Sequence, residues 1–404
     1  MLHAAFEAVI REERTSICAS LIRMTSDWEL AEDCVQEACL RAWDLWSREG
    51  LPARPGGWLA TVAKRLALDH LRRARRQCPI PDELVGGNQP DDSVLSPAGV
   101  TGVEDDVLRL IFSCCHPALS EPSQVALTLR TVCGLTTREI ARAFVEAEPT
   151  TAQRLVRARR KLAEESVPFE LPSPSELPLR LVAVQAVVYL VFTEGYAASA
   201  GPALLRPDLS HEAIRLARLL VRLLPDDPET SGLLALMLLH DARGNSRVDR
   251  HGNFVLLADQ DRSLWDRGRI DEGVRILDKA LVASKGGPYQ TQAAIAALHA
   301  TAPSAADTDW GQITGLYGAM LRRSPNPVLE LNAAVAMAMA GDVDEALDWI
   351  ASLERRNVLK GYYLLPAAKA DLLRRCGRNS DAYVAYADAL SIAPTEAERR
   401  YLRG

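Results

Sequence analysis

The chain has 404 residues, which is long for one domain and predicts two or three. It is 48% hydrophobic and 25% charged, as in ordinary globular proteins, and the 5% aromatic share with abundant Ala, Leu and Arg favours helices. The formal net charge of −6 does not by itself suggest a nucleic-acid partner, so such binding would depend on local basic surfaces.

The eight cysteines contain no CxxC pair and no spacing typical of a disulfide framework. Cys18, Cys34 and Cys39 fall within helical patterns, where cysteine usually serves as a small buried hydrophobe. Charges interrupt Met1–Ile22, so this segment does not resemble a signal peptide, and no apolar run approaches the length of a membrane span. We therefore expect a cytoplasmic protein with reduced cysteines and no membrane contact.

Proline- and glycine-rich stretches divide the chain into three helical blocks, and we expect an all-α fold. The first block is 1–76, and an acidic linker follows at 77–106. The second block is 107–165, and residues 166–178 form a proline-rich linker. The third block, 179–404, alternates amphipathic helices with short turns.

The segment Asp27–Trp46 predicts an amphipathic helix. Its apolar face carries Ala31, Val35, Ala38, Ala42 and Leu45. A polar stripe lies on another face at helical spacing and consists of Asp33, Gln36, Glu37 and Arg41. By periodicity alone, this stripe is a solvated helix face.

The segment Arg54–Arg76 predicts a second amphipathic helix after a break at Gly50–Gly57. Between Arg54 and Cys78 the chain has seven basic residues and one acidic residue. The far end of this helix is therefore strongly cationic and suits a polyanion. Trp58 at its start has two interpretations, a core residue or an aromatic that stacks on an unpaired base.

The segment Leu135–Leu162 predicts two helices joined by a bend near Val145–Glu148. Thr136 and Glu139 have capping-box spacing, and Pro149 fits only in the first turn of the second helix. The inner face of that helix is Thr151, Leu155, Ala158 and Leu162, and its outer face is Thr150, Gln153, Arg154 and Arg157. Such a helix suits the major groove of DNA, and a solvated basic helix without a ligand is the alternative.

The order of these motifs resembles a known family. AEDxVQExxLRAW, GWLxxVAxxxxxDxLRRxRR, TxxEIAxxF and TxxQRLxRARxKL follow one another as in group IV (extracytoplasmic-function) sigma-70 factors. The resemblance covers about residues 5–165, with the first two motifs similar to the σ2 domain and the last two to σ4. It implies a cytoplasmic transcription factor whose partners are core RNA polymerase and promoter DNA.

The resemblance also implies roles for particular residues. Asp33, Gln36, Glu37 and Arg41 match the helix that docks on core polymerase. Trp58, Arg65, Asp69, Arg72, Arg73 and Arg76 lie where the family binds and melts the −10 element. Thr150, Thr151, Gln153, Arg154 and Arg157 fall on the recognition helix for the −35 element.

The third block contains three helix–turn–helix segments with glycines at Gly268, Gly341 and Gly377. The first two glycines are separated by about two lengths of a tetratricopeptide (TPR) repeat of about 34 residues, and the last two by about one. This spacing predicts an α-solenoid, and an unrelated helical bundle is the alternative. The segments VFTEGYAAS, LLALMLLHDAR, DQDRSLWDR and GPYQTQAAIAALHA are similar to the C-terminal TPR-like extension of one sigma-factor subgroup. The resemblance implies a regulatory domain, and a helical array of this kind suits a protein or peptide regulator.

Two groups of residues are weak candidates for metal or ligand sites. Cys114-Cys115-His116 places adjacent ligands before a proline, a poor arrangement for tetrahedral coordination. A second group allows a ligand or ion site around a turn, although we expect its histidine to end a packed helix and its first aspartate to pair with Arg243 or Arg247; the group is His240, Asp241, His251 and Asp259. No nucleophile elbow or phosphate loop is present. We therefore expect no enzyme activity, no catalytic residue, no metal and no cofactor.

Two other functional classes remain open from the residues alone. A helix-turn-helix regulator with a TPR-like sensor domain would bind duplex DNA without polymerase, usually as a dimer. A scaffold protein would carry the basic helices without using them. Promoter-dependent transcription with core polymerase separates the sigma factor from both.

Overall fold

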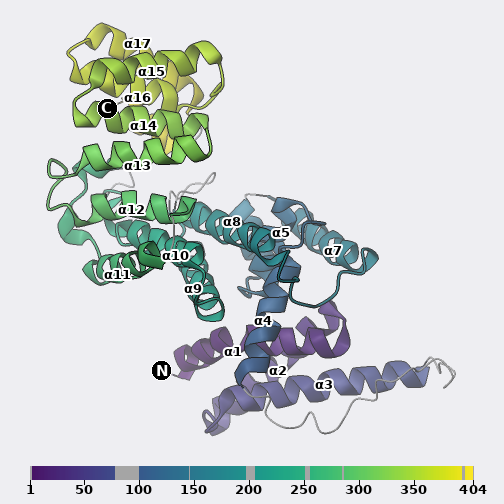
Figure 1. Cartoon of the computed structure of the whole chain (residues 1–404). Coiled ribbons are helices and arrows are strands. Elements are labelled where there is room, and N and C mark those ends of the chain that lie inside the picture. Colours follow the sequence, from purple (N-terminus) through teal and green to yellow (C-terminus); the bar gives the residue numbers. More distant parts are fainter. Residues whose placement is uncertain are drawn as a thin grey trace. The chain divides into compact units, whose positions relative to one another are not determined.

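The computed structural model describes residues 2–77, 100–144, 146–196, 205–250, 255–283, 286–393 and 396–403. This part of the chain forms α-helices α1 to α18 with short 3-10 turns and no β-strand, which confirms the all-α prediction (Figure 1). The chain divides into two compact units, Met1–Leu190 and Val191–Gly404, and the boundary between them falls within α8.

The described residues of the first unit form seven complete helices and most of an eighth. They are α1 (Leu2–Thr25), α2 (Trp28–Glu49), α3 (Pro55–Gln77), α4 (Val100–Cys114), α5 (Glu121–Thr131), α6 (Thr137–Phe144), α7 (Glu148–Glu164) and α8 (Leu177–Tyr196). Helices α1, α2 and α3 pack against one another, α4 packs on α1 and on α5, and α7 packs on α5 and α6. The largest fully buried side chains of this core are Ile22, Trp46, Leu59, Leu110, Ile111, Phe112, Leu127, Leu129 and Ile140.

Local sequence signals fix the ends of α2 and the start of α3. The Asp27 side chain accepts hydrogen bonds from two backbone N–H groups in the first turn of α2. Gly50 ends this helix with φ of 84°, a backbone conformation that glycine adopts without strain. Pro55 begins α3, so Gly56 lies inside the helix, where a Cβ atom would come within 2.4 Å of the Glu13 side chain on α1. The predicted break is therefore shorter than the predicted Gly50–Gly57.

The acidic linker is also shorter than predicted at its C-terminal end. Residues 78–99 lie outside the described part of the chain, but Val100–Asp106 form the first turns of α4 instead of a linker. Asp106 is buried and pairs with Arg23 of α1 at 2.8 Å and with Arg109 of its own helix at 2.7 Å. Two guanidinium partners allow this acidic residue to be buried within a helix.

The second unit is a succession of helices joined by short connections. They are α9 (Pro207–Leu223), α10 (Pro228–Asp241), α11 (Arg267–Ala283), α12 (Pro288–Thr301), α13 (Trp310–Arg323), α14 (Pro327–Ala340), α15 (Val343–Arg356), α16 (Leu364–Arg375), α17 (Asn379–Ile392) and α18 (Glu396–Arg403), with 3-10 turns η3 (Gly244–Ser246), η4 (Leu257–Asp259) and η5 (Arg262–Leu264). Consecutive helices from α13 to α17 lie side by side (Figure 1). Gly341 and Gly377 have positive φ at helix ends, as the repeat pattern predicts. Gly268 lies inside the first turn of α11, so the prediction of a turn glycine was wrong there.

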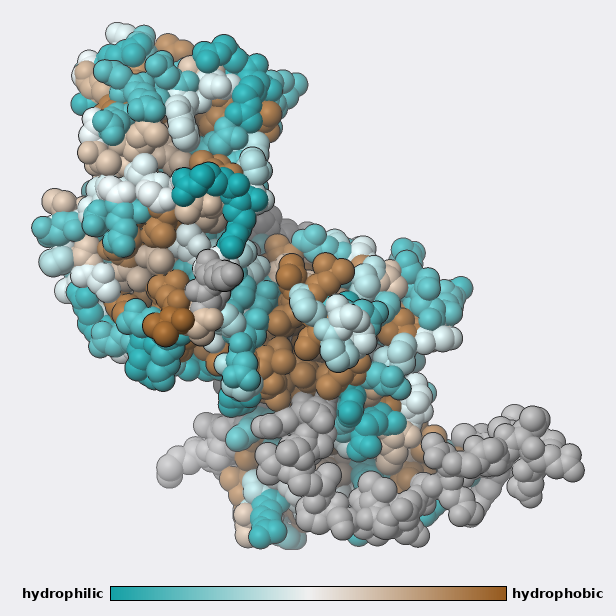
Figure 2. Space-filling model, in the orientation of Figure 1, coloured by the Kyte–Doolittle hydropathy of each residue, from teal (hydrophilic) through white to brown (hydrophobic). Residues whose placement is uncertain are grey.

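Helix α8 has the length and the composition of a membrane-crossing helix, with 39% of its most apolar window buried in the protein. The expectation that no apolar run reaches this length was therefore wrong, although a core helix has the same composition. Val184, Val187 and Val188 are fully buried, whereas Leu179 and Val182 are 78% and 59% exposed. Figure 2 shows hydrophobic residues on the surface among hydrophilic ones. One such helix is weak evidence for a membrane.

Candidate functional site

The polar stripe of α2 lies on the protein surface. Asp33, Gln36 and Arg41 are exposed, and Glu37 is half-buried. Arg41 donates from Nε to Oε1 of Glu37 at 2.8 Å, an ion pair between successive helical turns. The stripe is therefore a fixed surface that no other described part of the first unit covers.

Two apolar side chains flank this stripe, and neither is among the residues predicted to bind polymerase. Leu40 is 63% exposed and Trp43 is 39% exposed. Leu40 lies three residues after Glu37 and one before Arg41, so its helical position could have placed it on the same surface. Leu40 therefore adds an apolar side chain to the exposed side of α2.

Among the acidic residues in the first turns of α2, only Glu32 is buried, with 3% of its surface exposed. Its Oε1 atom accepts from Arg159 Nη2 at 2.7 Å and from the Thr131 hydroxyl at 3.2 Å. Its Oε2 atom accepts from Arg130 Nε at 3.2 Å. One carboxylate of the first helical block thus holds α5 and α7 of the second block.

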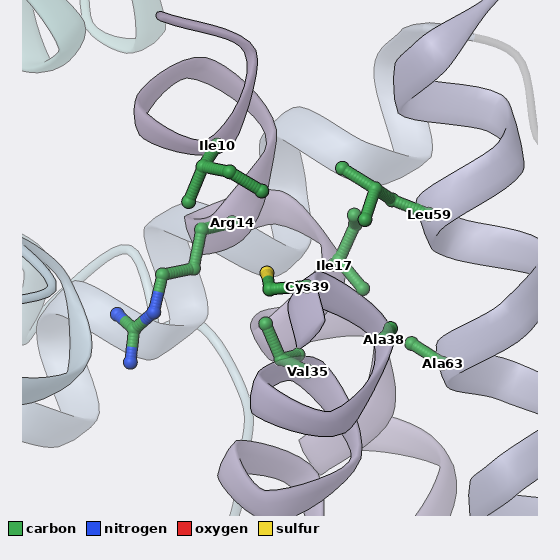
Figure 3. Close-up of a pocket in the computed structure, with 8 residues that line it drawn as sticks. All are labelled: Ile10, Arg14, Ile17, Val35, Ala38, Cys39, Leu59 and Ala63. Atoms are coloured by element: carbon green, nitrogen blue, oxygen red, sulfur yellow. The ribbon is translucent and has the colours of Figure 1, made fainter. Parts of the chain in front are cut away.

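Helix α1 extends this interface. The Thr15 hydroxyl donates to the Val132 carbonyl at 2.8 Å, and Arg14 donates to the Arg130 carbonyl at 3.4 Å. Figure 3 shows that the Arg14 guanidinium points away from the apolar side chains, such as Ile17, that fill the space between α1, α2 and α3. These contacts, together with those of Glu32, form what we call the interblock clasp.

The cationic part of α3 is exposed. Arg65, Asp69, Arg72 and Arg73 all lie on the surface, and Arg72 pairs with Asp69 at 3.5 Å. Arg76 belongs to α3, but its side chain lies outside the described residues. A basic helix surface of this kind suits phosphate contacts.

Trp58 in the first turn of α3 is half-buried. Its ring packs edge-on against the buried Trp46, with centroids 5.4 Å apart. Trp58 therefore belongs to the core in part and reaches the surface in part, and its stacking on an unpaired base stays a prediction.

The predicted helix-turn-helix is formed by α6 and α7. Thr136 and Glu139 form the predicted capping box, with the Thr136 N–H donating to Glu139 at 2.7 Å and the Glu139 N–H donating to the Thr136 hydroxyl at 3.2 Å. The bend falls before α7, whose first turn contains Pro149, as predicted. Leu155 and Ala158 are buried against the rest of the motif.

The residues on the outer face of α7 differ in whether they pair with another residue of the chain. Thr150, Gln153 and Arg157 are exposed. Arg154 makes a two-point ion pair with Glu146 and lies over the Phe144 ring at 5.1 Å. Burial acts to raise the pKa of Glu146, but hydrogen bonds from Arg154 and Thr151 outweigh it and lower that pKa.

One predicted contact on α7 is corrected, and one residue is added. Thr151 is fully buried, and its hydroxyl donates to Glu146 at 2.7 Å, so it stabilises the bend and cannot reach a base edge. Its place on the inner face of the helical wheel already indicated this burial. Val156 is 61% exposed near Gln153 and Arg157, and an apolar group there suits a thymine methyl.

The ion pair predicted around Asp241 is also different. Asp241 pairs with Arg269 and accepts from Ser210 at 3.1 Å, whereas Arg243 and Arg247 contact Tyr196. His240 lies in the last turn of the packed helix α10, close to the expected helix end, and His251 lies outside the described residues. Within the described ranges, no group of three or more His, Cys, Asp or Glu residues is placed to hold a metal ion.

Each of the two helical blocks of the first unit matches a known protein family. The family described as Sigma-70 region 2 matches residues 9–77, and Sigma-70, region 4 matches residues 109–162. A family of unknown function, DUF6596, matches residues 180–281. No solved structure matches the chain.

Three relatives show how far the likeness extends. The "Uncharacterized protein R00370" of Rhizobium meliloti is 42% identical over 96% of this chain and 92% of its own length. The "ECF RNA polymerase sigma factor SigL" of Mycobacterium tuberculosis is 32% identical over 39% of this chain and 87% of its own length. The "Probable ECF RNA polymerase sigma factor SigI" of the same species is 32% identical over 41% of this chain, which spans 57% of that relative. Because the first unit contains both sigma-70 regions in order and 87% of SigL aligns with the chain, the chain belongs to the ECF family of RNA polymerase sigma factors.

Proposed function

We propose that this sigma factor binds core RNA polymerase through the exposed α2 stripe and directs transcription from promoters with −10 and −35 elements. The observation that carries the proposal is the exposure of three separate polar surfaces on α2, α3 and α7. The residues assigned to polymerase are Asp33, Gln36, Glu37 and Arg41; those assigned to the −10 element are Trp58, Arg65, Asp69, Arg72, Arg73 and Arg76; and those assigned to the −35 element are Thr150, Gln153, Arg154 and Arg157.

The experiment is run-off transcription with purified chain and core polymerase on promoters mapped from the chromatin that the chain occupies in cells. We expect initiation that depends on both proteins and on both promoter elements. A helix-turn-helix regulator would instead bind its duplex site tightly without polymerase. Because the chain carries a net charge of −6, we expect only weak binding of the free protein to DNA.

The interblock clasp must open for this function. Elements centred at −10 and −35 are separated by about 25 base pairs, or about 85 Å at about 3.4 Å per pair. A compact body of about 165 residues has a radius of gyration of only about 15 Å. The packed arrangement held by Glu32 therefore cannot place α3 and α7 on both elements at once, and we assign it to the factor free of promoter DNA.

The second unit acts, in our proposal, as a regulatory domain built from TPR-like helical pairs. The turn glycines at Gly341 and Gly377 and the side-by-side helices α13 to α17 support this assignment. Such an array suits a protein or peptide regulator on its surface. We place the protein in the cytoplasm, where core polymerase and promoter DNA are found.

Removal of the second unit tests its regulatory role, and the contacts of α8 determine at which residue the shortened chain should end. Arg180 at the start of α8 donates to the Phe112 carbonyl of α4 at 2.7 Å, so a chain ending at Pro178 would lose a contact of the first unit. A chain ending at Leu190 retains it. We expect the chain that ends at Leu190 to differ several-fold from the full-length chain in transcription, in either direction. Unchanged activity would contradict a regulatory role.

A further inference from the structure

Four segments that are far apart in the sequence meet at one polar cluster in the second unit, in which Arg243 is buried and the other four residues are half-buried. Tyr196 ends α8, His240 lies in the last turn of α10, Arg243 lies just after that helix, Arg262 begins η5, and His299 lies near the end of α12. They belong to the four segments VFTEGYAAS, LLALMLLHDAR, DQDRSLWDR and GPYQTQAAIAALHA, to which the proposed function assigns no role. We call these five residues the Arg243 cluster.

Arg243 lies at the centre of the cluster and is 7% exposed. Its Nη2 atom donates to the Tyr196 hydroxyl at 2.8 Å and lies 2.6 Å from Nδ1 of His240. The Tyr196 and His240 rings are 5.1 Å apart. Both partners of the guanidinium are therefore neutral groups, and the Tyr196 hydroxyl hydrogen is left to donate elsewhere.

Arg262 supplies a second guanidinium. Its Nη1 atom donates to the carbonyls of His299 and Ala302 at 2.7 and 2.8 Å, which caps the end of α12. The guanidinium also lies over the ring of the buried Trp265, at 4.4 Å. Again these contacts are to neutral groups, and Asp307, the acid that acts on the charge of Arg262, does not lie at ion-pair distance from it.

The charge balance of the cluster is unusual for a protein interior. Within the described ranges, no carboxylate lies at ion-pair distance from Arg243 or Arg262, and Asp241, the nearest acid in sequence, pairs with Arg269 instead. Burial and the nearby arginines lower the pKa of both His240 and His299, so neither adds charge near neutral pH. A buried guanidinium group such as that of Arg243 normally pairs with an anion, because removing an unpaired charge from water is costly.

We propose that the Arg243 cluster binds the anionic group, phosphate or carboxylate, of a small molecule. Arg243 and Arg262 supply the positive charge, and the Tyr196 hydroxyl donates a hydrogen bond. Because both histidines are neutral in the free protein, each also has an imidazole N–H to donate. The second unit is thereby a sensor of a small anionic compound, in addition to any protein that its helical surface binds.

The test uses the full-length chain without polymerase or DNA, so it is independent of the sigma-factor activity. Thermal unfolding and calorimetric titration at pH 7.5 would compare inorganic phosphate, malonate and chloride at equal ionic strength. We expect saturable stabilisation by phosphate or by malonate but not by chloride. The effective anion identifies which of the two groups the natural ligand carries.

Two variants locate the site. Arg243→Gln should weaken binding of the effective anion at least about tenfold, and Tyr196→Phe, which retains the ring, should weaken it by a smaller factor. Arg322→Gln, which changes an exposed arginine of α13, should bind as the unchanged chain does. Absence of saturable binding by the unchanged chain would overturn the proposal even if Arg243→Gln fails to fold, and so would equal binding by Tyr196→Phe and the unchanged chain.

Discussion

Arg159 of α7 donates to the buried carboxylate of Glu32 in α2 at 2.7 Å, across 127 residues of sequence. The two residues lie in different sigma-70 regions, one in the segment matched by region 2 and the other in that matched by region 4. Arg130 completes the group at 3.2 Å. The charge of Glu32 therefore joins the two regions in the first unit.

Replacing Glu32 with Gln keeps the shape of the side chain and removes its charge. Arg159 and Arg130 would then be partly buried without an acid, and breaking a buried pair in this way costs about 3–5 kcal/mol. We expect the two regions to separate, which would raise the radius of gyration of the chain in X-ray scattering. Because the open form is then more populated, the affinity for core polymerase should increase.

The matched control is Glu164→Gln, which removes the acid of an exposed pair with Arg160 on the same helix as Arg159. It should change neither the radius of gyration nor polymerase affinity, since exposed pairs contribute little. If Glu32→Gln folds with an unchanged radius, or binds polymerase more weakly, the clasp does not restrain the factor.

The α2 stripe allows a charge reversal that retains its internal ion pair. In the double variant Glu37→Lys with Arg41→Glu, the two side chains can still pair between successive turns, so helix stability should change by only about 0.5 kcal/mol. The surface presented to polymerase is reversed in sign. We expect affinity for core polymerase to fall at least about tenfold, measured by interferometry, with unchanged circular dichroism.

The control for this reversal is the pair of Asp371 and Arg375 in the second unit, which has the same spacing; its half-buried aspartate also pairs with Arg374. Asp371→Lys with Arg375→Glu should bind polymerase as the unchanged chain does. Equal affinity of the two double variants would contradict the assignment of the α2 stripe.

Local patterns predicted much of the sigma-like surface. The Thr136–Glu139 capping box and the exposed residues of α2 follow from spacing within one or two helical turns, and the structure confirms both. The same reasoning could not find the burial of Glu32, because its cover comes from α5 and α7 about a hundred residues later. From its own helix, Glu32 looks like any residue at the edge of a polar face.

Ion pairs were the least predictable feature for the same reason. The sequence suggests that Asp241 pairs with a nearby arginine, but folding brings it to Arg269 instead and leaves Arg243 beside Tyr196. Likewise, Arg154 has the position of a DNA contact on the helical wheel, but the bend before α7 places Glu146 within reach. Periodicity determines the face of a helix, whereas tertiary packing determines the partner.

The pairing of Arg154 predicts an order of effects on α7. Arg157 is exposed and free to contact DNA, whereas Arg154 must exchange the Glu146 carboxylate for an acceptor on DNA. We expect Arg157→Ala to weaken −35 recognition by about 1–3 kcal/mol if it contacts a base, and Arg154→Ala to weaken it less. The measurement is binding of the polymerase holoenzyme to promoters with single changes in the −35 element.

Arg160→Ala is the control within α7, because Arg160 pairs with Glu164 far from the N-terminal turns that enter the groove. A loss for Arg157→Ala that is equal at every promoter, with a smaller salt dependence, would mean a phosphate contact instead of a base contact. A larger loss for Arg154→Ala than for Arg157→Ala would contradict the predicted order.

The neutral histidines of the second unit predict a loss of stability in acid. Burial, Arg243 and Arg262 lower the pKa of His299 from 6.5 to about 4. Between these values the unfolded chain binds a proton that the folded chain does not, so the free energy of unfolding falls as the pH falls from about 6.5 towards 4. For His299 the loss is on the order of 3 kcal/mol.

The variant His299→Gln isolates this contribution, since glutamine does not titrate in this range. Hydrogen exchange of the α12 amides, corrected for intrinsic rates, would report the local free energy of opening from pH 7.5 to pH 5. Compared with the unchanged chain, His299→Gln should be less stable at pH 7.5, and the difference should shrink as the pH falls because only the unchanged chain loses the neutral imidazole. A difference that stays constant over this range would show that His299 is not held neutral by Arg243 and Arg262.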